Sequence, residues 1–141
     1  MIGREGGRIL VTGALGQIGT DLVQSLRDIY GSEMVIASDI REKPNHPCIL
    51  TGPYINLDVL DKNKIFEIIS NHNIKIIYHL AAILSAKGEE NPELCELINV
   101  EGTRNIFDAA REFGLRIFAP SSIAVFGPDT PKKAPQITPL N

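Results

Sequence analysis

A short apolar run at residues 9–12 breaks into GALGQIG at residues 13–19, in which three glycines are spaced three residues apart. A second apolar run, residues 34–38, is followed at once by Asp39, twenty positions beyond the last glycine. A buried strand, a glycine-rich turn, a helix, a second strand and a terminal acidic residue, in this order, are typical of a dinucleotide-binding βαβ unit. The sequence therefore predicts a parallel sheet and a nicotinamide cofactor.

The glycines would give the turn three separate properties. Gly13 would allow the tight turn, Gly16 the close approach of a pyrophosphate, and Gly19 the packing of helix against strand. Because a pyrophosphate is bound by backbone N–H groups at a helix N-terminus, we expect contacts also at Gln17 and Ile18. The spacing is GxxGxxG, one residue longer than the common GxGxxG pattern.

Asp39 is expected to accept hydrogen bonds from the hydroxyls of the adenosine ribose, together with its neighbour Ile40 in the same subsite. A 2′-phosphate would meet a like charge there, so the sequence favours NAD over NADP. Arg41, two residues on, can soften that preference. The alternative interpretation makes Asp39 a solvated turn residue.

The remaining chain alternates further strands with helices, which predicts an α/β, Rossmann-type doubly wound parallel sheet of five strands without the C-terminal part of that fold. The expected strands are residues 9–12, 34–38, 54–57, 74–80 and 115–119. Helical spacing is shown by Ile18, Leu22, Leu26 and Ile29 in the first helix; Asp61 is expected to cap the second, and the third runs from Pro92 to about Phe113. Residues 40–54 are expected to be loop. Residues 1–127 form the predicted NAD-binding domain, and residues 128–141 a proline-rich loop or disordered tail.

Ligands of such sheets bind at the carboxyl ends of the strands, which directs attention to three further segments. After the third strand, Asp58 and Val59 face the adenine, or else Asp58 is a turn residue. After the fourth, Leu80, Ala81 and Ala82 let backbone pass close to the cofactor, or else serve packing. Ser121 and Ser122 follow the fifth strand, where a substrate would meet the nicotinamide; the alternative for them is a turn or capping role.

These motifs together resemble the extended short-chain dehydrogenase/reductase family, which includes nucleotide-sugar epimerases and dehydratases. The resemblance rests on TGxxGxxG, Asp39, LDVLD, HLAA, NVEGT at residues 99–103 and SSIAVFG, and it covers residues 8 to about 131. Within the family, GALGQIGTDL, ASDI, YHLAAILSAKGE and IFAPSSIAVFGPDTP are most similar to the NAD-dependent L-threonine 3-dehydrogenases. The resemblance implies oxidation of the 3-hydroxyl of L-threonine, or a similar amino alcohol, to a ketone.

The same resemblance implies roles for individual residues. Ser122 matches the catalytic Ser/Thr that hydrogen-bonds the reacting hydroxyl, and Ser85 matches a position near the substrate. Asn99 matches an asparagine on the cofactor side of the site, and Ser121 is also expected to contact the cofactor. A homodimer is implied for a full-length form.

One part of the family pattern is not present in these residues. The family's base is a Tyr in a YxxxK motif beyond the catalytic Ser, and Tyr30, Tyr54 and Tyr78 all lie upstream of Ser122. Because alcohol oxidation needs a base, we expect the 141-residue chain alone to be inactive. Two alternatives stay open: a nucleotide-sugar epimerase or dehydratase, and a non-catalytic NAD-binding module.

Charge and cysteine usage narrow the choice of partners. The net charge is −3, and the 14 Lys and Arg residues form no cluster, which argues against nucleic acid as a partner. No apolar stretch reaches the roughly 20 residues that span a bilayer. Cys48 and Cys95 lie far apart without a CxxC motif, so a cytoplasmic protein with free thiols and no metal is expected.

Overall fold

The computed structural model describes residues 6–84, 88–122, 125–127, 130–132, 135 and 137–138. Five parallel strands form one sheet in the order β3-β2-β1-β4-β5. The strands are β1 (Arg8–Thr12), β2 (Val35–Asp39), β3 (Tyr54–Asn56), β4 (Ile74–His79) and β5 (Arg116–Phe118). The helices are α1 (Gln17–Tyr30), α2 (Pro47–Leu50), α3 (Lys62–His72), α5 (Pro92–Glu96) and α6 (Thr103–Phe113), with a 3-10 turn η2 (Ser32–Met34) and a π-helical segment η3 (Leu97–Gly102). The predicted Rossmann-type doubly wound sheet is confirmed.

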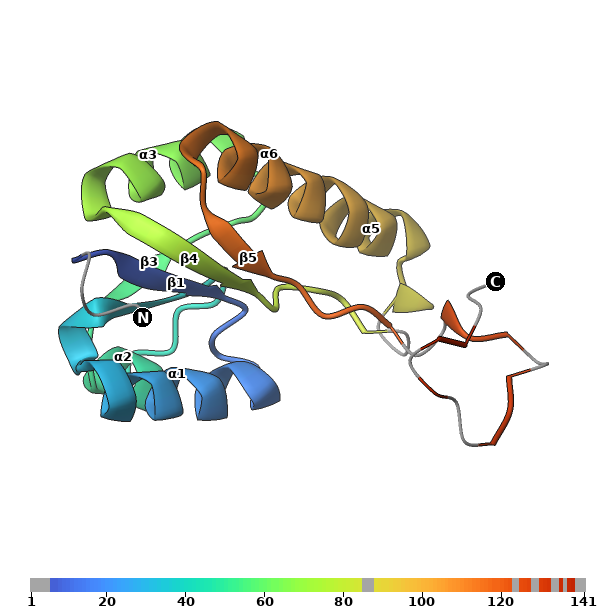
Figure 1. The fold of residues 1–141 in the computed structure, drawn as a ribbon, viewed down its shortest axis with the longest axis horizontal. Coiled ribbons are helices and arrows are strands. Elements are labelled where there is room, and N and C mark those ends of the chain that lie inside the picture. Colours follow the sequence, from blue (N-terminus) through green and yellow to red (C-terminus); the bar gives the residue numbers. More distant parts are fainter. Residues whose placement is uncertain are drawn as a thin grey trace.

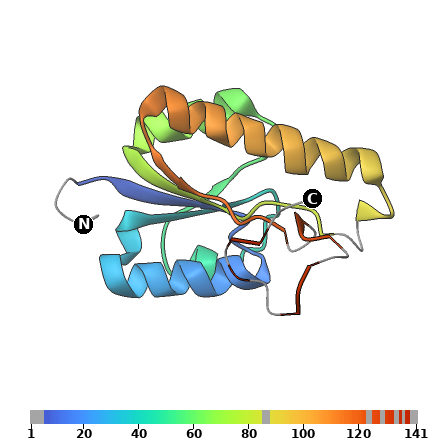
Figure 2. The same cartoon turned by 45° about the vertical axis from the view of Figure 1, so that its right-hand side comes forward.

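Helices cover both faces of the sheet, as Figures 1 and 2 show. Helices α1 and α2 lie on one face, and α3 with the α5–η3–α6 helix lies on the other. Successive residues of a strand point to opposite faces, so Ile9 and Val11 pack toward α1 while Leu10 packs toward α3 and α6. The strand order reverses between β1 and β4, and the strands' carboxyl ends meet at one edge of the sheet.

Of the four apolar residues that mark α1 in the sequence, Leu22 and Leu26 pack against the core and the other two do not. Ile18 and Ile29 are 70% and 69% exposed, whereas the buried residues are Gly19, Val23, Leu26 and Arg27. The reason is that Gly19 lets the helix approach the sheet closely. The Arg27 side chain can be buried there because its guanidinium finds hydrogen-bond acceptors. It donates to the carbonyls of Val35, Cys48 and Pro53 and to the hydroxyl of Thr51.

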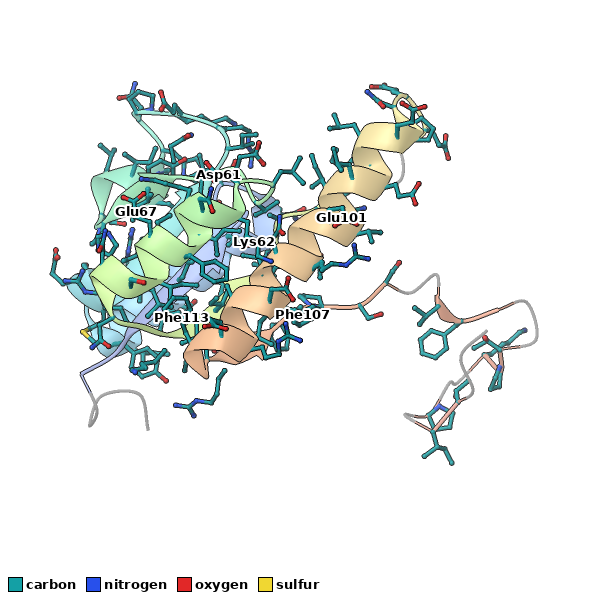
Figure 3. The ribbon with its side chains drawn as sticks, turned by 90° about the horizontal axis from the view of Figure 1, so that it is seen from above. Asp61, Lys62, Glu67, Glu101, Phe107 and Phe113 are labelled. Atoms are coloured by element: carbon teal, nitrogen blue, oxygen red, sulfur yellow. The ribbon has the colours of Figure 1, made fainter. Side chains whose placement is uncertain are left out.

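The two helices on the opposite face lie side by side across the sheet (Figure 3). Asp61 caps α3 as predicted, because its carboxylate accepts from the backbone N–H of Lys64 at 2.9 Å. An ion pair of 2.7 Å joins Lys62 to Asp108, and the rings of Phe66 and Phe113 meet edge to face with centroids 5.4 Å apart. Helices α3 and α6 are therefore joined by an ion pair and by an aromatic contact.

Two further differences from the expected elements concern local geometry. The segment expected to be loop contains the short helix α2, because His46 accepts from Cys48 N–H and Pro47 occupies the first turn. The long helix after Asn91 carries six π-helical residues, η3, within it. The described residues after 127 lie in no helix or strand, and the predicted boundary at 127 stays a prediction. In the described part of the chain, no helix combines the length and apolar character needed to cross a membrane.

Candidate functional site

The turn after β1 is built so closely against the end of β4 that only glycine fits at its first position. Gly13 has a φ of +68°, and a Cβ there would lie 2.6–2.7 Å from backbone atoms of Leu80 and Ala81. The end of β4 is tied to β1 by the Leu80 N–H, which donates to the Thr12 carbonyl at 3.1 Å. The structure thus brings Gly13, Leu80 and Ala81 together at the point where the strand order reverses.

The other two glycines position the start of α1. A Cβ at Gly19 would collide with the Gly13 carbonyl and lie 2.8 Å from the Cα of Ala14. Gly16 precedes the helix without a side chain to cap it, and the first turn carries no acidic residue. Because Gln17 and Ile18 in this turn are exposed, their end of the helix is accessible and has the partial positive charge that attracts an anion.

Asp39 ends β2 beside this turn and is only 5% exposed. Its Oδ2 accepts from the Leu15 N–H at 3.1 Å, and its Oδ1 accepts from the Arg41 N–H at 3.0 Å. The Arg41 guanidinium forms an ion pair with the same carboxylate, with Nε 2.8 Å from Oδ1. Burial would raise the pKa of Asp39, but the hydrogen bonds from Arg41 and Leu15 outweigh it and hold the pKa below its usual value. Asp39 is therefore a charged acceptor next to the glycine turn, and its neighbour Ile40 is 58% exposed.

After β3, the Asp58 side chain is half-buried and takes part in a turn, and its predicted contact with adenine stays a prediction. Its Oδ1 accepts from the Leu60 N–H at 2.9 Å, just before the Asp61 cap. Val59 is buried, and a Cβ at Gly102 would lie 2.7 Å from its Cγ2. Asn105, which the sequence did not single out, donates to the Val59 carbonyl at 3.1 Å. This segment is thus fixed to α6.

A buried polar chain that the sequence also did not single out joins the ends of β1 and β4. The hydroxyl of Thr12 lies 2.8 Å from Nδ1 of His79, and the hydroxyl of Thr103 lies 3.1 Å from Nε2. Burial lowers the pKa of His79 to about 4, so the ring is neutral at pH 7. The Thr12 hydroxyl also accepts from the Ala81 N–H at 3.4 Å. In the sequence, this hydrogen-bonded set is indicated only by the polar residues Thr12 and His79, which end the buried strands β1 and β4.

Asn99 lies in η3, and its side-chain amide is hydrogen-bonded to the backbone of the loop after β4. Its Oδ1 accepts from the Ile83 N–H at 2.8 Å, and its Nδ2 donates to the Ile83 carbonyl at 3.0 Å. Ala82, just before, is exposed. Ser85, the predicted substrate residue, lies outside the described residues. The amide of Asn99 therefore shapes the loop beside the site.

Ser121 and Ser122 follow β5 at the same edge of the sheet, and both are exposed. The carbonyl of Ser122 accepts from the Val125 N–H at 3.2 Å. Across the described residues, no group of three or more His, Cys, Asp and Glu side chains could hold a metal ion. The edge thus has an accessible helix N-terminus and a buried carboxylate at its centre, and hydroxyls toward β5.

Comparison with known proteins identifies the family of this chain. Residues 9–141 match the model of the NAD dependent epimerase/dehydratase family. The chain belongs to this family. It is 46% identical over 132 residues to an uncharacterized epimerase/dehydratase of Staphylococcus aureus (strain USA300), covering 93% of this chain and 41% of that protein.

Solved structures extend the likeness to one group within the family. A monomeric L-threonine 3-dehydrogenase from a metagenome, in its apo form, is 49% identical, with a TM-score of 0.85 over 94% of this chain and 42% of that one. L-threonine dehydrogenase from Clostridium difficile is 43% identical, with a TM-score of 0.91 over 98% of this chain and 44% of that one. The resemblance expected from the motifs is confirmed. The chain spans about two fifths of the length of these relatives.

Proposed function

We propose that this chain is the NAD-binding portion of an oxidoreductase that acts on L-threonine or a similar amino alcohol and yields 2-amino-3-ketobutyrate from threonine. The observation that carries the proposal is the turn at Gly13, Gly16 and Gly19, which opens onto an uncapped helix end beside the buried Asp39 carboxylate. The likeness to two L-threonine dehydrogenase structures, at 49% and 43% identity, supports the choice of substrate.

The residues present fit the cofactor. A pyrophosphate would be held by the N–H groups at the start of α1, where a Cβ at Gly13 or Gly19 would close the turn. Asp39 would hold the adenosine ribose, and the backbone at Leu80 to Ala82 would pass beside the nicotinamide half. When bound, NAD would accept the hydride. The chain's own residues bind and orient: Ser122 would hydrogen-bond the reacting hydroxyl, and Ser85 would lie near the substrate.

The whole protein is proposed to be a cytoplasmic homodimer. Exposed apolar side chains on the α5–η3–α6 helix support the pairing of two copies: Leu97 is 44% exposed, Val100 46% and Phe107 46%. Light scattering on the product of the native gene tests this, since a monomer at micromolar concentration would reject the dimer.

Titration calorimetry with NAD and NADP tests the proposed cofactor site. The wild-type chain should bind NAD more tightly than NADP, because Asp39 is held ionised. Asp39→Asn should weaken NAD binding roughly 10- to 100-fold, since charge-assisted hydrogen bonds contribute about 1.5–3 kcal/mol. Asp28→Asn, which neutralises an exposed carboxylate on α1, should leave the affinity unchanged. Equal binding by wild type and Asp39→Asn would reject this site.

The substrate is tested separately on the product of the native gene. NADH formation with L-threonine supports the proposal. Turnover of UDP- or dTDP-sugars without threonine-dependent NADH would favour the epimerase or dehydratase alternative instead.

A further inference from the structure

The buried hydrogen-bonded set of Thr12, His79 and Thr103 lies directly before the loop that follows β4. Thr12 and His79 are register partners at the ends of β1 and β4, and these residues are 1% and 5% exposed. Nδ1 of His79 is 2.8 Å from the Thr12 hydroxyl, and Nε2 is 3.1 Å from the Thr103 hydroxyl. A neutral imidazole has one donor and one acceptor nitrogen, and a hydroxyl can be either, so both nitrogens are paired at once. One ring thus joins β1, β4 and the start of α6.

The backbone of the loop after β4 is held at two points. The Thr12 carbonyl accepts from the Leu80 N–H at 3.1 Å, and the Thr12 hydroxyl accepts from the Ala81 N–H at 3.4 Å. Further on, the N–H and the carbonyl of Ile83 pair with the Asn99 side chain at 2.8 and 3.0 Å. Asn99 lies in η3, which leads directly into α6. The position of the loop therefore depends on contacts with β1 and with the η3–α6 helix.

The contact between the Thr12 hydroxyl and Ala81 is the longest of these, and His79 supports it. A threonine oxygen can occupy different χ1 rotamers, and the short contact with Nδ1 stabilises the rotamer in which the oxygen faces the Ala81 N–H. The next residue, Gly13, has so little space that a Cβ there would lie 2.6–2.7 Å from backbone atoms of Leu80 and Ala81. A small shift of the loop would therefore change the glycine turn and the strand exit together.

We propose that His79 is a positioning residue for the nicotinamide half of the cofactor. Through the Thr12 hydroxyl, its Nδ1 holds the backbone from Leu80 to Ala82 where it passes beside that half. The ring acts through Thr12 and touches neither cofactor nor substrate, because it is buried. The contact of Nε2 with Thr103 contributes to stability instead. This inference rests on the proposed cofactor site.

Two substitutions at His79 separate the two ring nitrogens. Asparagine places a polar atom one bond from Cγ, as Nδ1 is, so His79→Asn keeps a partner for Thr12. Glutamine places it two bonds from Cγ, as Nε2 is, so His79→Gln keeps a partner for Thr103 and loses the one for Thr12. Each variant lacks one buried hydrogen bond, and both should be less stable than wild type by similar amounts.

Calorimetric titration of the product of the native gene with NAD, and with ADP, which lacks the nicotinamide riboside, tests the proposal. His79→Gln should weaken NAD binding roughly three- to tenfold, the effect of about one hydrogen bond, and change ADP binding by less than about twofold. His79→Asn should bind both nucleotides within about twofold of wild type. Far-UV circular dichroism at the temperature of the titration checks that each variant keeps the fold.

A second pair of variants tests the same contact from β1. Thr12→Val keeps the shape of the side chain and removes the hydroxyl, so it should reproduce the selective loss of NAD affinity. Thr12→Ser retains the hydroxyl and should restore NAD binding to within about twofold of wild type. This pair decides the question if the His79 variants do not fold.

The outcomes separate this inference from the proposed function. A selective loss of NAD affinity in His79→Gln and Thr12→Val, absent from His79→Asn and Thr12→Ser, supports the positioning role. Equal losses of NAD and ADP affinity, or equal NAD affinity in the two members of a pair, would overturn it and leave the cofactor site in place. Absence of NAD and ADP binding in wild type would overturn the proposed function and this inference together.

Discussion

The two halves of the strand-end edge are built differently. On the adenosine side, the last residues of β1 and β2 are part of the core: Thr12 is 1% exposed, Ser38 0% and Asp39 5%. On the β5 side, Ser121 and Ser122 are exposed and the strand itself is an edge of the sheet. Substitutions on the side proposed to bind the cofactor should therefore also lower the stability of the fold. Substitutions of exposed residues on the side proposed to bind the substrate should affect stability less.

The largest expected effect breaks the adenosine side. Gly13→Ala should cost about 4 kcal/mol of unfolding free energy, through left-handed strain plus overpacking against the backbone of Leu80 and Ala81. Gly114→Ala is the matched control, because Gly114 has a φ of +64° with nothing within 4 Å of the added Cβ. It should cost only about 1 kcal/mol. Equal costs in urea unfolding would show that close approach contributes nothing at Gly13.

The next effect concerns pH at the junction of β1 and β4. Burial lowers the pKa of His79 to about 4, whereas an unfolded imidazole titrates near about 6.5. Since the folded chain holds the ring neutral, the stabilisation is complete above about pH 6.5 and is lost as the pH falls toward 4, by up to about 3 kcal/mol.

His79→Gln should flatten the dependence of unfolding free energy on pH between about 5 and 6.5. This range is chosen because ordinary carboxylates titrate below about pH 5. His72→Gln, at the end of α3, should keep the wild-type slope. The same slope in His79→Gln as in wild type would assign the pH dependence to other groups.

The smallest expected effect is the stability cost of replacing a serine by alanine, compared between the two sides of the strand-end edge. The Ser38 hydroxyl is buried and donates to the Val11 carbonyl at 3.0 Å. Ser38→Ala should therefore cost about 1–2 kcal/mol. Ser121→Ala, at an exposed side chain, should change stability by less than about 0.5 kcal/mol and leave ADP affinity unchanged. A loss at Ser121 as large as that at Ser38 would remove the contrast between the two sides. Thermal unfolding of both variants in one buffer measures it.

The elements that the sequence predicted well are those with a local cause. Apolar runs mark β1, β2 and β4 because strands covered on both faces need them. The three glycines mark the turn because no other residue fits at Gly13 and Gly19. Asp39 follows from its place after a buried strand.

The features that the sequence did not predict depend on partners distant along the chain. Arg27 lies on the buried face of α1 because carbonyls of Val35, Cys48 and Pro53 converge on it, and Ile18 and Ile29 are left outside. The His79 chain needs hydroxyls from β1 and α6. Asn99 turns to the Ile83 backbone, 16 positions upstream, which no spacing rule indicates.

The π-helical segment η3 makes chain length as important as residue identity in this helix. Its wide turn sets Asn99 toward the Ile83 loop while Thr103 and Asn105 face the ends of β4 and β3. Deleting one residue between 97 and 102 would turn the preceding helix by roughly 100° about its axis, the rotation of one α-helical residue. The hydrogen bonds between Asn99 and the Ile83 backbone would then be lost, although no residue of the site had been substituted. The packing of this helix against β3 and β4 therefore depends on the number of residues in it as well as on their identity.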